Sequence, residues 1–226
     1  MFLKIKNIPS VSWSSDNPLN IKPKLKTFVL LCFGLTIFGF GSSLLIHSEI
    51  GNAPWVVLAE GIASQFNWSI GFATFISSIV VLLIWIPLGE KPGIGTIMNI
   101  LIIATVLDVS TNIFNLTSNL FFINFFTALS GVIIVGIGSG IYLIANLGPG
   151  PRDGLMTGLQ KASGYPIAWV RSLIEITVVL LGWILGGTIG LGTLLFTFGV
   201  GPAVAFGLNI ISALNKEGAI SSELDR

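Results

Sequence analysis

Long apolar runs, separated by short polar or glycine-rich segments, make up most of this 226-residue chain. Six of these runs reach roughly 20 residues, the length that an α-helix needs to cross about 30 Å of hydrocarbon. The six predicted membrane spans are Thr27–Ser48, Ile70–Leu88, Ile94–Phe114, Phe121–Asn146, Pro166–Gly186 and Leu191–Leu214. The pattern therefore predicts an all-α integral membrane protein.

Two shorter segments, Pro54–Phe66 and Pro151–Ser163, also have a helical pattern. Each has about 13 residues and, at about 1.5 Å per residue, reaches only about 20 Å as a helix. That length is too short to span a bilayer. We expect both segments to be re-entrant or interfacial helices.

The composition agrees with a membrane protein and limits which binding partners and cofactors we expect. Hydrophobic residues make up 53% of the chain and charged residues only 9%, against roughly 25% charged in an ordinary soluble domain. The lipid bilayer is the expected partner, and a net charge of +1 gives no reason to expect nucleic acid. A single cysteine and a single histidine leave little material for a metal site, and we expect no cofactor. The tryptophans Trp13, Trp55, Trp68 and Trp85 fall near predicted membrane interfaces, as in an aromatic belt.

The positions of Lys and Arg predict the orientation, because cytoplasmic loops carry an excess of both. With six spans and a cytoplasmic N-terminal tail (residues 1–26), the loops that hold Lys91, Arg152 and Lys161 all lie on the cytoplasmic side. The C-terminal tail (residues 215–226) lies there too. We therefore expect a multi-pass protein of the cell membrane with both termini in the cytoplasm.

The chain also contains an internal repeat. Shifting the sequence by 97 positions aligns residues 39–108 with residues 136–205, and 16 of the 70 aligned pairs are identical, where chance gives roughly five or six. This predicts two three-span repeats, residues 27–120 and 121–214. An odd number of spans turns the second copy upside down, and such inverted repeats are typical of secondary transporters, whose interrupted helices mark the substrate site.

The first candidate site is the break before the second short helix. Glycines and prolines interrupt the chain there, and Gly150, Pro151, Arg152 and Asp153 lie at the start of the new helix. Unpaired helix N–H groups beside an arginine can hold an anionic head group or a substrate carboxylate. The same residues can also serve as a positively charged cytoplasmic anchor with an acidic cap.

Charged residues inside the predicted spans are the second set of candidates. Glu175 lies about 14 Å from the inner end of its span, and Arg171, one helical turn earlier, is its expected partner. This pair can bind a substrate or simply steer helix packing. Asp108 lies nearer the outer end of another span, where it can face a polar cavity or cap the span.

Several motifs carry a resemblance to a known family. The segments Gly148–Leu155 and Val178–Gly192, together with Ile86–Gly89 and Lys91–Thr96, resemble those of the YczE/YyaS/YitT-type bacterial integral membrane proteins. The similarity is greatest to the YczE branch and covers about residues 27–213. It implies a multi-span protein of the bacterial inner membrane, and it implies no substrate.

These observations favour a small secondary transporter or permease for a polar or anionic small molecule, with its site between the two repeats. The alternative is a non-transporting accessory, scaffold or regulatory protein that docks a partner on its cytoplasmic face. We do not expect an enzyme, because acid/base chemistry needs more convergent ionisable groups than this chain offers. The sequence leaves the oligomeric state open.

Overall fold

The computed structural model describes residues 8–114 and 118–224, and for residues 214–224 it describes the backbone alone. Within these ranges the chain forms eight helices and no strand. They are α1 (Leu25–Ser48), α2 (Pro54–Phe66), α3 (Ile70–Leu88), α4 (Ile94–Ile113), α5 (Phe121–Ala145), α6 (Pro151–Ser163), α7 (Ile167–Ile184) and α8 (Leu191–Leu224). Six of them, α1, α3, α4, α5, α7 and the Leu191–Ala213 part of α8, are long and apolar enough to cross a membrane. The predicted all-helical fold with six spans is confirmed.

The two short helices begin and end where the sequence predicts. Both start with a proline, Pro54 in α2 and Pro151 in α6, and proline suits the first helical position because the N–H that it lacks has no partner there. Both end on a left-handed residue, Asn67 after α2 and Gly164 after α6. Each helix has 13 residues, so neither is long enough to span a membrane.

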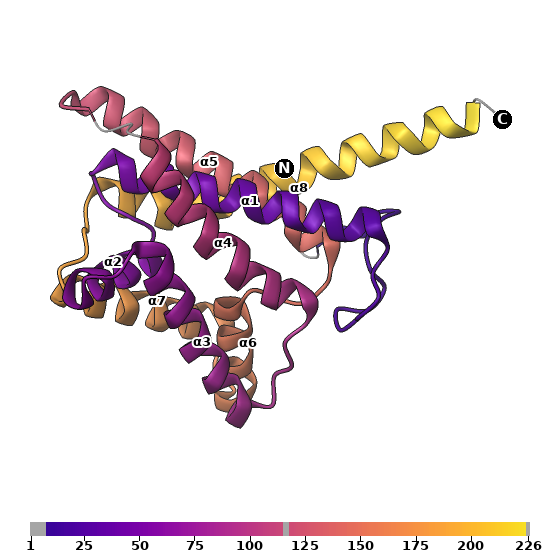
Figure 1. Ribbon diagram of the computed structural model, residues 1–226. Coiled ribbons are helices and arrows are strands. Elements are labelled where there is room, and N and C mark those ends of the chain that lie inside the picture. The colour runs from indigo at the N-terminus through magenta and orange to yellow at the C-terminus, as the bar shows by residue number, and fades with distance from the viewer. Residues whose placement is uncertain (1–7, 115–117, 225–226) are drawn as a thin grey trace.

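The last helix is longer than expected. The part of α8 that is apolar enough to span a membrane, Leu191–Ala213, agrees with the predicted span Leu191–Leu214. The backbone stays helical beyond it as far as Leu224, through a segment that contains no proline and includes the helix formers Lys216 and Glu217. Figure 1 shows this end of α8 extending away from the other helices. The last two residues of the predicted tail lie outside the described residues.

Part of the predicted N-terminal tail packs against the helices. The backbone N–H of Ser15 donates to the Ala145 carbonyl at 3.1 Å, and the Asn146 amide donates to the Ser15 carbonyl at 2.7 Å. Trp13, expected at the interface, is only 6% exposed and belongs to the main hydrophobic core. The segment before α1 therefore docks on the end of α5. Residues 1–7 of the tail lie outside the described residues.

The helices form two groups with α4 between them (Figure 1). In one group α5 packs between α1 and α8, and in the other α2 contacts α3 and α7, while α6 also contacts α3 and α7. Glycines bring α1 and α5 close together: a Cβ on Gly41 would lie 2.7 Å from the Val135 nitrogen, and one on Gly138 would lie 2.6 Å from the Phe38 nitrogen. Close packing of this kind depends on small residues in membrane helices.

Contacts between the two halves recur at the repeat spacing of 97 residues. The Gly95 N–H donates to the Leu147 carbonyl at 2.7 Å, and the Gly192 N–H donates to the Ile50 carbonyl at 2.8 Å. Gly192 is 97 residues after Gly95, and Leu147 is 97 residues after Ile50. Each half thus holds the other through equivalent atoms, the contact pattern of a self-complementary interface.

The turns before the two short helices also make equivalent contacts at a spacing of 97 residues. Gly51 has φ +116° and packs against Gly190, whereas Gly148 has φ +112° and packs against Gly93. Only glycine adopts such angles without strain. A Cβ on Gly148 would also lie 2.9 Å from the Cα of Gly93. These two glycines let the chain leave one long helix and start a short one beside the other half.

Candidate functional site

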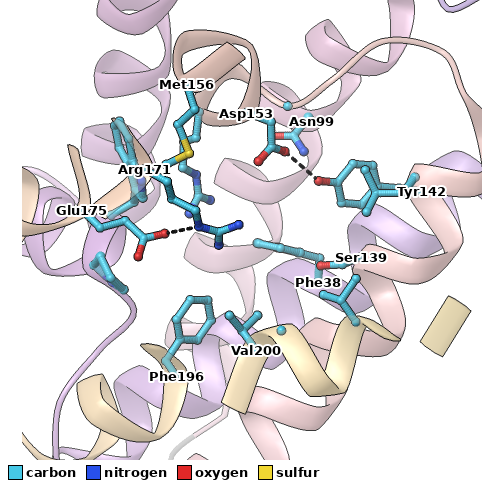
Figure 2. Close-up of a pocket in the computed structure, with 17 residues that line it drawn as sticks. Phe38, Asn99, Ser139, Tyr142, Asp153, Met156, Arg171, Glu175, Phe196 and Val200 are labelled. Carbon is cyan, nitrogen blue, oxygen red and sulfur yellow. Dashed lines mark hydrogen bonds and ion pairs between the residues drawn. The ribbon is translucent and has the colours of Figure 1, made fainter. Parts of the chain in front are cut away.

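A cavity of about 260 Å³ lies where α1, α4, α5, α6, α7 and α8 meet the start of α2. Figure 2 shows the 17 residues that line it. Five of the seven residues predicted from the sequence are among them: Gly150, Arg152, Asp153, Arg171 and Glu175. The tertiary structure therefore brings together the charged start of α6 and the charged turn of α7, which are about 20 residues apart in sequence.

The start of α6 is held in place by α3 and α4. The Trp85 indole N–H donates to the carbonyl of Pro151 at 3.0 Å, and the Thr96 hydroxyl donates to the carbonyl of Pro149 at 2.7 Å. Trp85 is 1% exposed, so it belongs to the interior and not to the expected interfacial belt. Its N–H can be buried because Pro151 supplies an acceptor. Pro151 itself is buried next to the cavity and does not line it.

Arg152 lines the cavity and forms no ion pair within the described part of the chain. Its Cζ lies 5.7 Å from the ring centroids of both Phe38 and Trp55, within the range of a cation–π interaction. The ion pairs among the described residues do not include Arg152, and it donates no hydrogen bond to any of them. Burial lowers the pKa of this guanidinium and the Asp153 carboxylate opposes that shift, and an arginine remains charged in proteins.

Asp153, the next residue of α6, also lines the cavity. Its Oδ2 accepts a hydrogen bond from the Tyr142 hydroxyl at 3.2 Å, as Figure 2 shows. A Cβ on Gly150 would lie 3.3 Å from this carboxylate oxygen and 3.4 Å from the amide nitrogen of Asn99. Glycine at position 150 thus leaves room between two polar groups that face the cavity.

Arg171 and Glu175 form the ion pair expected from their spacing. Arg171 Nε lies 2.9 Å from Glu175 Oε1, and their side chains are 53% and 22% exposed. In Figure 2 this pair and the Asp153–Tyr142 pair lie on opposite sides of the cavity. The lining therefore contains two arginines and two carboxylates, and its formal charge sums to zero.

Asp108, the remaining candidate, lies elsewhere. Its Oδ2 accepts from the Ser69 hydroxyl at 2.7 Å and its Oδ1 accepts from the Gly71 N–H at 2.8 Å. Ser69 and Gly71 are at the N-terminus of α3, where free N–H groups favour a carboxylate. Asp108 thus caps the neighbouring helix, and the structure does not bring it together with the other candidates.

Several lining residues escaped the sequence reasoning, among them Phe38, Trp55, Asn99, Ser139 and Tyr142. Asn99 carried a usable signal, because an amide inside an apolar span needs a polar environment. Trp55 carried another, because it stands 97 residues before Arg152. Ser139 is in turn 97 residues after Ser42, and the two are identical. The aromatic residues gave no signal, because rings are common throughout this chain.

A second, much smaller cavity of about 20 Å³ adjoins the same arginine. Trp55 and Arg152 line both cavities. Seven residues of the small cavity are Ser42, Trp55, Val56, Thr74, Ser78, Ile103 and Leu107. The residues 97 positions later all line the large one: Ser139, Arg152, Asp153, Arg171, Glu175, Val200 and Val204. The two cavities thus occupy equivalent positions of the two repeats, and all four charges of the large one replace uncharged residues of the small one.

Six helices that are long and apolar enough to cross a membrane define a multi-pass membrane protein, in contact with the lipid bilayer. The chain belongs to a family described as a family of unknown function (DUF6198), whose profile matches residues 25–209.

Comparison with individual proteins agrees with this assignment. The chain is 43% identical over 211 residues to an uncharacterized protein of Haemophilus influenzae, an alignment that covers 93% of this chain and 95% of the relative. It is 31% identical over 177 residues to the uncharacterized membrane protein YczE of Bacillus subtilis, covering 77% and 82% of the two chains. A third relative, YyaS of Bacillus subtilis, is 26% identical over 167 residues, covering 72% and 82%. No solved structure matches the chain. The predicted YczE-type membership is confirmed.

Proposed function

We propose that this protein is a small secondary transporter for a polar or anionic small molecule, built from two three-span repeats of opposite orientation. The observation that carries the proposal is the pair of cavities at equivalent positions of the two repeats, about 260 Å³ and about 20 Å³ in volume. Inverted repeats let a transporter exchange the conformations of its halves around one central site.

The unequal sizes of the two cavities support this mechanism. If the repeats are inverted, the large cavity leads toward one face of the membrane and the small cavity toward the other. A state in which one is open and the other closed is then one of two related states. In the second state the cavity at Ser42 and Ile103 is open, and the cavity at Ser139 and Val200 is closed. Arg152 and Trp55, which line both cavities, remain between them.

The charges support a polar or anionic substrate. Arg152 lines the cavity without an acidic partner among the described residues, and a cation in such surroundings favours an anionic group. The Lys and Arg distribution supports cytoplasmic termini, because Lys91 and Lys161 then lie on the same face as the tails.

Cysteine accessibility tests the proposal without knowledge of the substrate. In a Cys32→Ser background we would introduce Val200→Cys in the large cavity and, separately, Ile103→Cys at the equivalent position of the small one. Each variant is labelled with a membrane-impermeant thiol reagent in right-side-out and in inverted membranes. Val135→Cys is the matched control, because this valine is fully buried between helices and lines neither cavity.

Transport predicts that Val200→Cys reacts from one face and Ile103→Cys from the opposite face, the second more slowly because its cavity is mostly closed. Val135→Cys should react from neither. If both cavity positions react from the same face, or if only Val200→Cys reacts at all, alternating access is rejected. The docking or scaffold role then becomes the better account of the protein.

A further inference from the structure

We infer that the large cavity binds a zwitterion with a compact apolar side chain, the chemical class of the neutral amino acids. This inference rests on the proposed function and narrows its substrate. It depends on two features of the lining: the sum of its charges, and the opposite signs of the two charged groups that form no ion pair with any residue that the structure describes.

The formal charge of the lining is zero, from Arg152, Arg171, Asp153 and Glu175. A net anion in this cavity would leave one uncompensated negative charge, which is costly away from water. A zwitterion adds no net charge and still offers a carboxylate and an ammonium to groups of the opposite sign. The charge sum therefore favours a zwitterion over a simple anion.

Arg171 and Glu175 neutralise each other at 2.9 Å, so the groups left for a ligand are Arg152 and Asp153. Arg152 contacts aromatic rings. Asp153 has a neutral phenol as its hydrogen-bond partner, at 3.2 Å, and it belongs to no ion pair of the described residues. The two residues are adjacent in sequence, but the Arg152 side chain contacts the rings of Phe38 and Trp55, whereas the Asp153 side chain accepts a hydrogen bond from Tyr142. A ligand carboxylate fits the arginine fork, and a ligand ammonium fits the aspartate.

Trp55 adds an independent observation at the carboxylate end. Its indole Nε1 is buried and has no hydrogen-bond partner among the described residues, although Trp55 lines the cavity. A buried donor without an acceptor is unfavourable, because it has lost its hydrogen bond to water. The Arg152 guanidinium lies 5.7 Å from the ring centroid of Trp55. An acceptor bound to Arg152 thus lies near a second donor that lacks one.

Part of the remaining wall is apolar, and the space is small. The apolar lining includes Met156, Phe196, Val200 and Val204. A volume of about 260 Å³ is below the range of roughly 300–1,000 Å³ that drug-sized ligands occupy. The cavity therefore suits a short apolar side chain between its charged ends.

A series of three probes with one carbon skeleton tests the inference on the purified full-length protein. L-Leucine carries both charged groups, 4-methylpentanoate lacks the ammonium, and 3-methylbutylamine lacks the carboxylate. Binding is measured by isothermal titration, and thermal unfolding is followed in parallel. We expect leucine to bind at least about tenfold more tightly than either fragment, a difference of about 1.4 kcal/mol. Leucine should also give the largest rise in the thermal midpoint.

Two variants assign the ends of the ligand. Asp153→Asn keeps the shape of the side chain, so it should lower leucine affinity while leaving 4-methylpentanoate affinity equal or higher. Arg152→Lys keeps the charge but loses the planar fork, so it should lower leucine affinity while leaving 3-methylbutylamine unchanged. The control is Lys161→Gln, which removes a cation of the same helix that lies outside the cavity. It should not change the affinity for any probe.

Equal affinity for leucine and 4-methylpentanoate would overturn the inference and indicate an anion site. The absence of leucine binding would also overturn it. Uptake of labelled leucine into proteoliposomes separates this result from the transport proposal. Selective binding without uptake keeps the zwitterion site and rejects transport. Opposite-face labelling of Val200→Cys and Ile103→Cys without selective binding keeps transport and rejects the zwitterion.

Discussion

The guanidinium of Arg152 lies 5.7 Å from the ring centroid of Trp55, the residue 97 positions earlier at the equivalent place in the first repeat. If the two copies are related by a two-fold axis, as we propose, a residue that contacts its own counterpart lies close to that axis. One copy supplies the cation and the other supplies the aromatic face. This single charge lies at the boundary of both cavities, so a change at Arg152 should affect both.

Arg152→Gln should abolish ligand binding and transport while the protein stays in the membrane at normal level. The cation–π contacts with Phe38 and Trp55 are worth about 0.5–2 kcal/mol, too little for their loss to unfold the protein. Arg152→Lys should restore only part of the activity, because a point charge does not replace the planar fork. Membrane abundance and ligand affinity are measured together. Reduced abundance with unchanged affinity would show that Arg152 is a structural anchor.

Glu175→Gln should leave abundance unchanged and lower transport at least about tenfold if the carboxylate acts in the transport cycle. The amide keeps the shape of the side chain, and the Arg171 side chain is 53% exposed, so the loss of its partner does not leave a buried charge. The informative control is the double change Glu175→Gln with Arg171→Gln. Recovery of transport in the double variant would assign the pair a packing role only.

Glu60 should matter much more for stability than Glu90, although both are acidic residues near loops. Glu60 accepts hydrogen bonds from the Asn52 amide at 2.9 Å, and from the N–H and hydroxyl of Thr188 at 2.7 and 2.9 Å. Losing such charged hydrogen bonds costs about 1.5–3 kcal/mol each at most. Glu90 pairs with Lys161, whose side chain is 67% exposed, a contact worth about 0–1 kcal/mol.

The measurement is the thermal midpoint of Glu60→Ala and of Glu90→Ala at low and high salt. Glu60→Ala should lower it clearly under both conditions. The smaller effect of Glu90→Ala should fade at high salt, because salt screens exposed charges. Equal effects of the two changes would contradict the role of Glu60 in holding Thr188 of the α7–α8 loop.

Gly154→Ala should destabilise the protein by about 1–3 kcal/mol through overpacking. A Cβ at this position would overlap the ring of Trp85. This ring is fully buried, and its N–H donates a hydrogen bond to the Pro151 carbonyl. Gly201→Ala is the matched control, since a Cβ there meets nothing within 4 Å. We expect the control to be neutral or slightly stabilising in thermal unfolding, because alanine favours a helix over glycine. A neutral Gly154→Ala would mean that Trp85 can move.

The orientation is tested with single cysteines in the Cys32→Ser background. Cysteines at the exposed positions Asn67 and Asn119 should react with an impermeant reagent in intact cells. Cysteines at Glu90 and Lys161 should react only after the membrane is opened, because the loops rich in Lys and Arg are cytoplasmic. Labelling of the second group in intact cells would reverse or refute the proposed topology.

The sequence by itself determined the helices. Spans of roughly 20 apolar residues have few stable alternatives in a bilayer, since every backbone group must find a partner within its own segment. Proline at the first position placed the starts of α2 and α6 at Pro54 and Pro151. The i, i+4 spacing also placed Arg171 beside Glu175. These features depend only on residues close together in the chain, so they can be predicted from the sequence.

Only the tertiary structure decided which charges share a site. Asp108 and Glu175 are both carboxylates within apolar spans, yet Asp108 caps α3 through Gly71 while Glu175 lines the cavity. Burial of Trp13 and of Trp85 likewise depended on acceptors and packing partners from distant segments. Which helix faces reach one another depends on side-chain packing between elements far apart in the chain. Hydropathy and spacing within one helix carry no information about that contact.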